Sequence, residues 1–169
     1  TLLLNQPIAI MSGKSEQGQR GLGFRSLLAN PVQKNILSII NTIKKREWFR
    51  PFACTILKEE AHKYFEINEG ESSPYMMFVY KCKNPRLKNV CSVDNYSRIQ
   101  TLEKSFHPKY YELIKSFKEL SGMPVVLNTS LNLPGKVLVE DFDDLHYFLK
   151  NSNLKYCYLP DHNKLVWLK

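Results

Sequence analysis

The chain has 169 residues, of which 43% are hydrophobic and 24% charged, and its formal net charge is +8 at pH 7. This length fits one globular domain, and no apolar run approaches the roughly 18 residues that a membrane-spanning helix needs. The four cysteines and four histidines are dispersed, which excludes a short Cys/His zinc module and predicts neither a disulfide framework nor a metal site in this chain. We therefore expect a cytoplasmic protein whose excess positive charge attracts anions.

The first half of the sequence alternates apolar segments with polar loops. Residues 4–11 predict a strand, and a glycine-rich basic loop follows at residues 18–26. Asn30-Pro31 is typical of a helix start, and the apolar residues after it recur at helical spacing, which predicts a helix over 31–45. This half is completed by a strand over 52–57, a short helix near 58–65 and a loop over 66–74.

The second half continues the same alternation. Pro108 and Gly122 mark the ends of another long helix, with Leu120 expected on its inner face. Residues 124–127 predict a short buried strand, and residues 128–135 predict a polar loop. The other expected elements are a strand over 75–81, a polar turn at 84–89, strand segments at 90–93 and 98–102 around an Asp94-Asn95 turn, a helix over 141–150 and a hairpin of strands near 155–159 and 164–168. Strands alternating with helices predict a mixed α/β or α+β class.

Two basic segments are candidates for anion binding. The first is the glycine-rich loop with Arg20 and Arg25, because backbone N–H groups and guanidinium groups suit phosphate oxygens. The second begins with Lys44 at the expected helix end and includes Arg50, whose apolar neighbours indicate a guanidinium held against a packed wall. A flexible surface loop and a helix-capping role for Lys44 remain open as the ordinary explanations.

Two further segments, 93–100 and 127–132, carry polar side chains beside expected strands. The former holds Arg98, and the latter holds Asn128 and Ser130 directly after a buried strand. Loops beyond strand ends are where α/β proteins bind ligands. Short polar side chains equally form plain turns with their own backbone, so each segment alone leaves both explanations open.

Together and in this order, the segments resemble one family. The motifs are Glu16-x-Gly18-x-Arg20-x-Leu22-Gly23-x-Arg25-Ser26, Lys44-x-Arg46-Glu47-x-Phe49-Arg50-Pro51-Phe52-Ala53, Ser73-Pro74-Tyr75-Met76, Val93-Asp94 with Ser97-Arg98-x-Gln100-Thr101, and Leu127-Asn128-Thr129-Ser130-x-Asn132. Over about residues 8–150 they resemble the C-terminal domain of the NodU-type O-carbamoyltransferases. Five blocks in order are far more specific than any one of them.

The resemblance implies a YrdC-like fold over residues 1–169, a twisted mixed sheet with packed helices. It implies a site that binds ATP, Mg²⁺ and carbamoyl phosphate to make carbamoyl-adenylate. The implied catalytic residues are Lys44, Arg50 and Arg98, and the implied nucleotide-binding residues are Arg20, Arg25, Asn128 and Ser130. An N-terminal Kae1-like domain of the same polypeptide, absent from this chain, would hold a metal ion and the small-molecule hydroxyl acceptor of the carbamoyl group.

The chain departs from the family pattern at several positions. Gln19 and Gly21 stand where the family has Pro and Ala, which predicts a looser glycine-rich loop. Cys54 stands where Pro is usual and Leu131 where Phe is usual. Tyr96 occupies a normally small position beside Arg98, where we expect it to crowd or restack a bound base.

Two other function classes remain open. A basic YrdC-like module that holds RNA would fit the charge, but the cations cluster in anion-binding loops rather than along one stripe, so neither nucleic acid nor membrane is the expected partner. The second class is a catalytically inactive interaction domain. The sequence leaves open the acceptor, what precedes Thr1 and the oligomeric state, with a homodimer among the possibilities; the missing initiator Met predicts a fragment of a longer protein.

Overall fold

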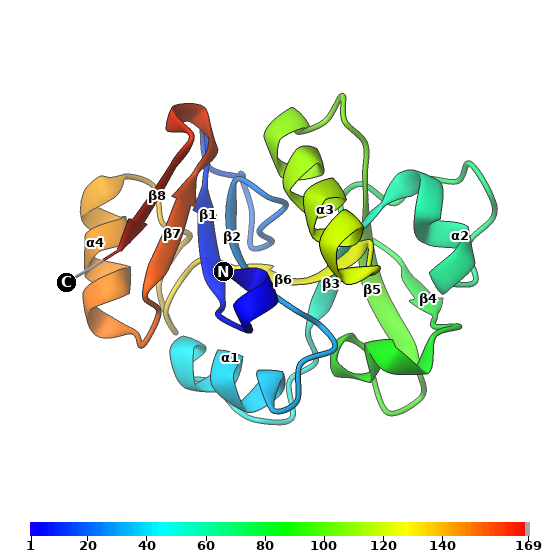
Figure 1. Ribbon diagram of the computed structural model, residues 1–169. Coiled ribbons are helices and arrows are strands. Elements are labelled where there is room, and N and C mark those ends of the chain that lie inside the picture. The colour runs from blue at the N-terminus through cyan, green and yellow to red at the C-terminus, as the bar shows by residue number, and fades with distance from the viewer. Residues whose placement is uncertain (168–169) are drawn as a thin grey trace.

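The computed structural model describes residues 1–167 as a twisted eight-stranded mixed sheet with packed helices (Figure 1). The strands are β1 (Ile8–Met11), β2 (Arg25–Ala29), β3 (Ala53–Leu57), β4 (Val79–Lys81), β5 (Tyr96–Leu102), β6 (Val125–Ser130), β7 (Tyr156–Leu159) and β8 (Lys164–Trp167). The α-helices are α1 (Ile36–Lys44), α2 (Ala61–Tyr64), α3 (Pro108–Ser121) and α4 (Phe142–Asn151), and 3₁₀ helices lie at Leu2–Leu4, Lys58–Glu60, Pro85–Val90 and Pro160–His162. This architecture confirms the expected α/β class.

The order of strands across the sheet is β4-β5-β3-β6-β2-β1-β7-β8. The β3/β5 and β1/β7 pairs are parallel, and the other neighbours are antiparallel. Leu28 of β2 lies opposite Asn128 of β6, and Ala9 of β1 lies opposite Cys157 of β7. The centre of the sheet therefore joins segments that are far apart in the sequence.

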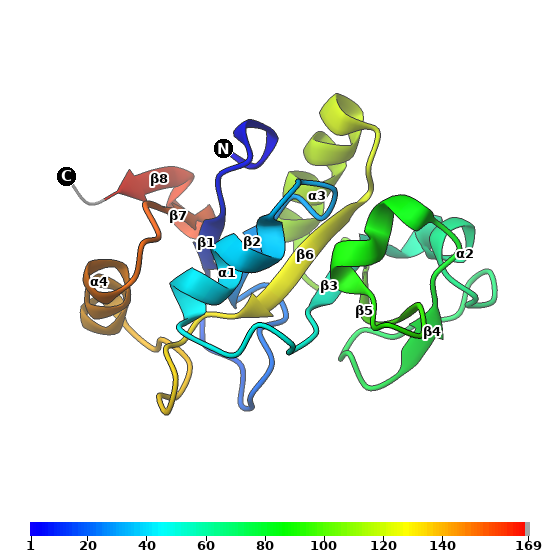
Figure 2. The same cartoon turned by 90° about the horizontal axis from the view of Figure 1, so that it is seen from below.

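Helices cover the sheet and bury the core. The buried face of α1 includes Ile36, Ile40 and Ile43, as its spacing predicted, and α3 packs against β3 and β6. Leu120, expected on the inner face of α3, is 71% exposed because it lies about a quarter turn from the buried stripe. Figures 1 and 2 place α4 at the β7–β8 end of the sheet and α2 at the β4 end.

Three boundaries in the core differ from the expectation. Residues 25–29 form β2, where a loop through residue 26 was expected. The first long helix begins at Ile36 rather than at residue 31, because the Asn30 side chain accepts from the Val32 amide and stabilises a turn there instead. The sixth strand continues to Ser130, since the Asn128 side chain bonds to Thr55 of β3 and the Ser130 hydroxyl accepts from Lys44 of α1.

The ends of the sheet also differ in detail. A single strand, β5, replaces the two segments expected around the Asp94-Asn95 turn, and that turn precedes it. Residues 85–90 form a 3₁₀ helix where a polar turn was expected, and β1 and β4 are shorter than predicted. The terminal hairpin of β7 and β8 is confirmed, although residue 168 lies outside the described residues. In the described part of the chain, every helix is too short or too polar to cross a membrane.

Candidate functional site

A polar cleft of about 800 Å³ lies where the glycine-rich loop, the end of α1 and the loop after β6 meet. This volume is in the range of small-molecule sites. Its charged lining residues are Lys44, Lys45, Arg46, Arg50 and Lys136 against Glu16, Glu47 and Glu140. Cations outnumber carboxylates, which favours an anionic ligand.

Lys44, the last residue of α1, is a buried cation at the wall of the cleft. Its Nζ donates to the main-chain oxygens of Ser130 (2.6 Å) and Asn132 (2.7 Å) and to Asn132 Oδ1 (2.6 Å). It forms no ion pair with a carboxylate among residues 1–167. Burial and the charges of Arg46 and Arg50 lower the pKa of Lys44 to about 7. A bound anion would supply the missing negative charge.

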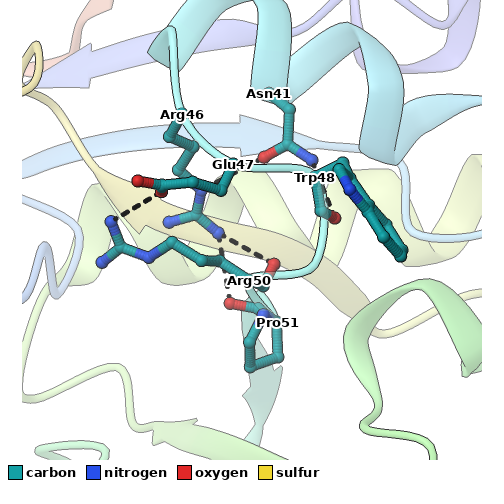
Figure 3. A network of polar contacts seen from close by, with 6 residues as sticks. All are labelled: Asn41, Arg46, Glu47, Trp48, Arg50 and Pro51. Carbon is teal, nitrogen blue, oxygen red and sulfur yellow. Dashed lines mark hydrogen bonds and ion pairs between the residues drawn. The ribbon is translucent and has the colours of Figure 1, made fainter.

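The turn after α1 places two arginines differently from the expectation (Figure 3). The Arg46 guanidinium lies 4.0 Å from the centroid of the Phe52 ring and donates to the main-chain oxygens of Arg50 and Pro51. The Arg50 side chain is 56% exposed and lies 3.6 Å from Glu47. The expectation that apolar neighbours hold Arg50 was therefore wrong, because Arg46 takes that place. Arg50 instead lines the open cleft.

A buried amide network ties the glycine-rich loop to the sheet. Asn128 Nδ2 donates to the Gly21 carbonyl (3.1 Å) and to Thr55 Oγ1 (2.9 Å). Gln100 Nε2 donates to the Leu22 carbonyl (2.9 Å), and Gln100 Oε1 accepts from Thr55 (2.8 Å). Asn128 Oδ1 is buried and has no partner in the described part of the protein. Three neighbouring strands thus fix the position of one loop.

Arg25 lies beneath the cleft. It is 2% exposed, and its guanidinium donates to five main-chain oxygens, those of Ser12, Gly13, Phe24, Val139 and Glu140. All five guanidinium N–H groups are therefore engaged within the fold. These contacts favour a positioning role, in which Arg25 joins β2 to the loop after β6.

The other end of the glycine-rich loop is equally constrained. Glu16 Oε1 accepts from the Leu22 and Phe24 amides. A Cβ at Gly21 would lie 2.4 Å from the Arg25 carbonyl oxygen, so an alanine does not fit this conformation. The expected loosening was wrong at Gly21, because the absence of a side chain lets the loop pack closely there.

Arg20 and Arg98 form a second cluster of positive charge beside the cleft. Arg98 lies on β5, two residues from Gln100 and therefore on the same face of the sheet. Partial burial and the charge of Arg20 lower the pKa of Arg98. Arg20 Nη1 lies 3.9 Å from Met77 Sδ, and neither arginine forms an ion pair within residues 1–167.

The structure sorts the seven predicted site residues into three places. Lys44, Arg50 and Ser130 meet at the cleft, Arg25 and Asn128 are buried, and Arg20 and Arg98 lie beside it. The sequence pointed to no separate role for Arg46, Gln100 or Asn132, although all three stand in the motifs. It missed Thr55, which lies inside a strand and had no signal. Among the described residues, His, Cys, Asp and Glu form no group of three or more that could hold a metal.

Replacing Arg50 by alanine is expected to weaken binding of a phosphate-bearing ligand by about 1–2 kcal/mol, around the lower end of the range for charged hydrogen bonds because the side chain is exposed. The neighbouring Lys45 also lines the cleft and so cannot serve as an unaffected control. Arg86→Ala is the matched control, because Arg86 is exposed and outside the cleft lining. Calorimetric titration of both variants checks this, and equal losses would contradict the placement of the site.

Comparison with known proteins gives concordant matches. The family described as "Carbamoyltransferase C-terminus" matches residues 1–164. Nodulation protein NolO of Bradyrhizobium diazoefficiens is 37% identical over 142 residues, which cover 81% of this chain and 26% of that protein. Nodulation protein U of Sinorhizobium fredii is 36% identical over 138 residues, covering 80% and 24% respectively. The chain thus spans about a quarter of the length of these curated relatives.

A solved structure of full-length HypF in a phosphate- and nucleotide-bound form is also similar. The TM-score is 0.62 at 20% sequence identity, and the match covers 88% of this chain and 18% of HypF. At that identity the likeness shows the fold. It confirms the expected YrdC-like arrangement of a twisted mixed sheet with packed helices.

Proposed function

Since the chain belongs to the family of carbamoyltransferase C-terminal domains, we propose that it binds ATP and carbamoyl phosphate and forms carbamoyl-adenylate. The observation that carries this proposal is the cationic cleft around Lys44, where a buried ammonium has no carboxylate partner among residues 1–167. The HypF structure, 18% of which matches this fold, is described as phosphate- and nucleotide-bound, which supports the binding of a nucleotide.

In the proposed reaction, carbamoyl phosphate, ATP and one water give carbamoyl-adenylate, pyrophosphate and inorganic phosphate. Carbamoyl phosphate, ATP and both leaving groups are anionic, so the chain needs fixed cations rather than a nucleophilic side chain. Lys44 and Arg50 would stabilise the charge that develops on the departing pyrophosphate, and Mg²⁺ would screen the phosphates. The Lys44 bonds hold the Ser130–Asn132 segment at the cleft, which leaves polar groups in place for the carbamoyl group.

Transfer of the carbamoyl group to a hydroxyl would take place on a second, Kae1-like domain with its own metal ion. Transfer requires the acceptor oxygen to be activated and held near the carbamoyl carbon. The charged lining of the cleft is mainly cationic, which suits phosphate rather than the deprotonation of a hydroxyl. Two domains in contact would also shield a labile adenylate from water.

We expect the 169-residue chain, given ATP, carbamoyl phosphate and Mg²⁺, to release pyrophosphate slowly without carbamoylating any hydroxyl compound. A coupled pyrophosphate assay and mass spectrometry of a panel of sugars and alcohols measure the two halves separately. A reaction without carbamoyl phosphate is the control. Carbamoylated product from this chain alone would contradict the division of labour. Absence of pyrophosphate even with a Kae1-like domain added would contradict the activation role and favour an inactive interaction domain.

A further inference from the structure

A second cavity of about 300 Å³ adjoins the cationic cleft, between the loop after β6 and helix α4. The two hollows share Asn132, Leu133, Lys136, Val137 and Leu138. The cavity is also lined by Val139, Asp143, Asp144, Tyr147 and Phe148. Its position makes it an extension of the site rather than a separate one.

The lining of this cavity suits a flat ring. Leu133, Leu138 and Phe148 are buried and give it an apolar floor, while Tyr147 is 52% exposed at its side. Lys136 Nζ lies 5.9 Å from the centroid of the Tyr147 ring. An aromatic side chain with an accessible face is a stacking platform for a nucleic acid base.

The cavity also differs from the cleft in charge. Asp143 is exposed in the first turn of α4 and accepts no side-chain hydrogen bond and forms no ion pair among residues 1–167. The neighbouring Asp144 already accepts from the Glu140 amide at 3.0 Å. A free carboxylate is an acceptor for an amino group and repels phosphate. The site therefore runs from a cationic end to an end that accepts hydrogen bonds.

A short chain of contacts connects the two ends. Lys44 Nζ donates to Asn132 Oδ1 at 2.6 Å, and Asn132 Nδ2 donates to the Lys136 carbonyl at 2.7 Å. One residue thus separates the ammonium at the phosphate end from Lys136, whose own ammonium lies near the Tyr147 ring on α4. A ligand with phosphates at one end and an aminated ring at the other matches this order.

We propose that the cavity beside α4 binds the base of the nucleotide, an aminopurine stacked on Tyr147 with its exocyclic amine bonded to Asp143. This inference rests on the proposed function, because it assumes that the nucleotide phosphates occupy the cleft around Lys44. It assigns base selectivity to α4, outside all the motifs that carry the family resemblance.

The test separates the base from the phosphates. Binding of ATP and of inorganic tripolyphosphate, which has no base, is measured by calorimetry for the wild-type chain, Tyr147→Ala and Phe142→Ala. Phe142 is the matched control, because it is an exposed aromatic residue on the same helix outside the cavity lining. Tyr147→Ala is expected to raise the Kd of ATP by roughly 5- to 150-fold, the range for loss of one stacked base, and to leave tripolyphosphate binding unchanged. Phe142→Ala changes neither.

A second variant tests the amine. Inosine triphosphate has no exocyclic amino group, so the wild-type chain is expected to bind ATP about fivefold more tightly than inosine triphosphate, and Asp143→Ala is expected to remove this preference. Equal affinity of the wild-type chain for ATP and tripolyphosphate, or equal losses in Tyr147→Ala and Phe142→Ala, would overturn the base site and leave the phosphate site intact. Failure of the wild-type chain to bind either ligand would overturn the proposed function itself.

Discussion

Replacing Arg25 by methionine is expected to lower the free energy of unfolding by about 3–5 kcal/mol, because it removes five hydrogen bonds to largely buried main-chain oxygens. The methionine fills much of the space, but it leaves five main-chain oxygens without the donors that the guanidinium supplies. Each buried oxygen without a partner costs about 1–3 kcal/mol unless water reaches it. Urea unfolding followed by circular dichroism measures the change.

The matched control for this prediction is Arg86→Met, which makes the same chemical change at an exposed residue. We expect the control to shift the free energy of unfolding by less than about 0.5 kcal/mol, as is usual for surface substitutions. A similar shift in both variants would contradict the structural role of Arg25. If Arg25→Met is fully stable but no longer binds ATP, the result would instead support the direct contact between Arg25 and the nucleotide that the family resemblance implied.

Replacing Lys44 by methionine is expected to weaken ATP binding by roughly 2–3 kcal/mol, which is the upper range for hydrogen bonds to charged groups. Two effects add here. The cleft loses its buried cation, and the four oxygens on Ser130 and Asn132 lose the donor that holds them. Calorimetric titration beside a thermal melt separates a binding defect from unfolding, and unchanged affinity would show that the phosphates lie elsewhere.

The same variant provides a pH test. Because the pKa of Lys44 is lowered to about 7, the ammonium is charged below that pH and increasingly neutral above it. An anion binds the charged form, so the advantage of the wild-type chain over Lys44→Met is expected to shrink as pH rises from about 6.5 to 8.5. The ratio of the two affinities cancels the titration of ATP itself. If the ratio of the wild-type affinity to the Lys44→Met affinity stays constant over this pH range, Lys44 does not lose its charge there.

The sequence predicted the fold class, the buried face of α1 and the terminal hairpin, because these depend on local apolar spacing and turn residues. It did not predict β2, since glycine and arginine at its start resemble a loop. The strand character of Asn128 was also missed. Short polar residues favour turns by their own propensity, and only the neighbouring Thr55 and Gln100 make a strand position favourable for this amide.

The cationic character of the site was predictable from the sequence, but the different positions and contacts of its arginines were not. Arg46 and Arg50 both follow α1, and the sequence places apolar neighbours next to Arg50. The left-handed conformation of Lys45 (φ 48°) turns the chain at the helix end, and Arg46 then lies against Phe52. Likewise, the five carbonyl groups around Arg25 come from three separate segments, so no local pattern could reveal them.

The central position of β6 has a consequence for how the chain is made. Strands β2 and β3 are both paired with β6, which leaves the ribosome roughly 100 residues after β2, or about 5–20 s later at usual rates of synthesis. Until then, the β1–β2 hairpin and the parallel β3–β5 pair each carry an open edge that can pair with another unfinished chain. The place of β6 in the sequence therefore sets the length of the interval in which misassembly competes with folding.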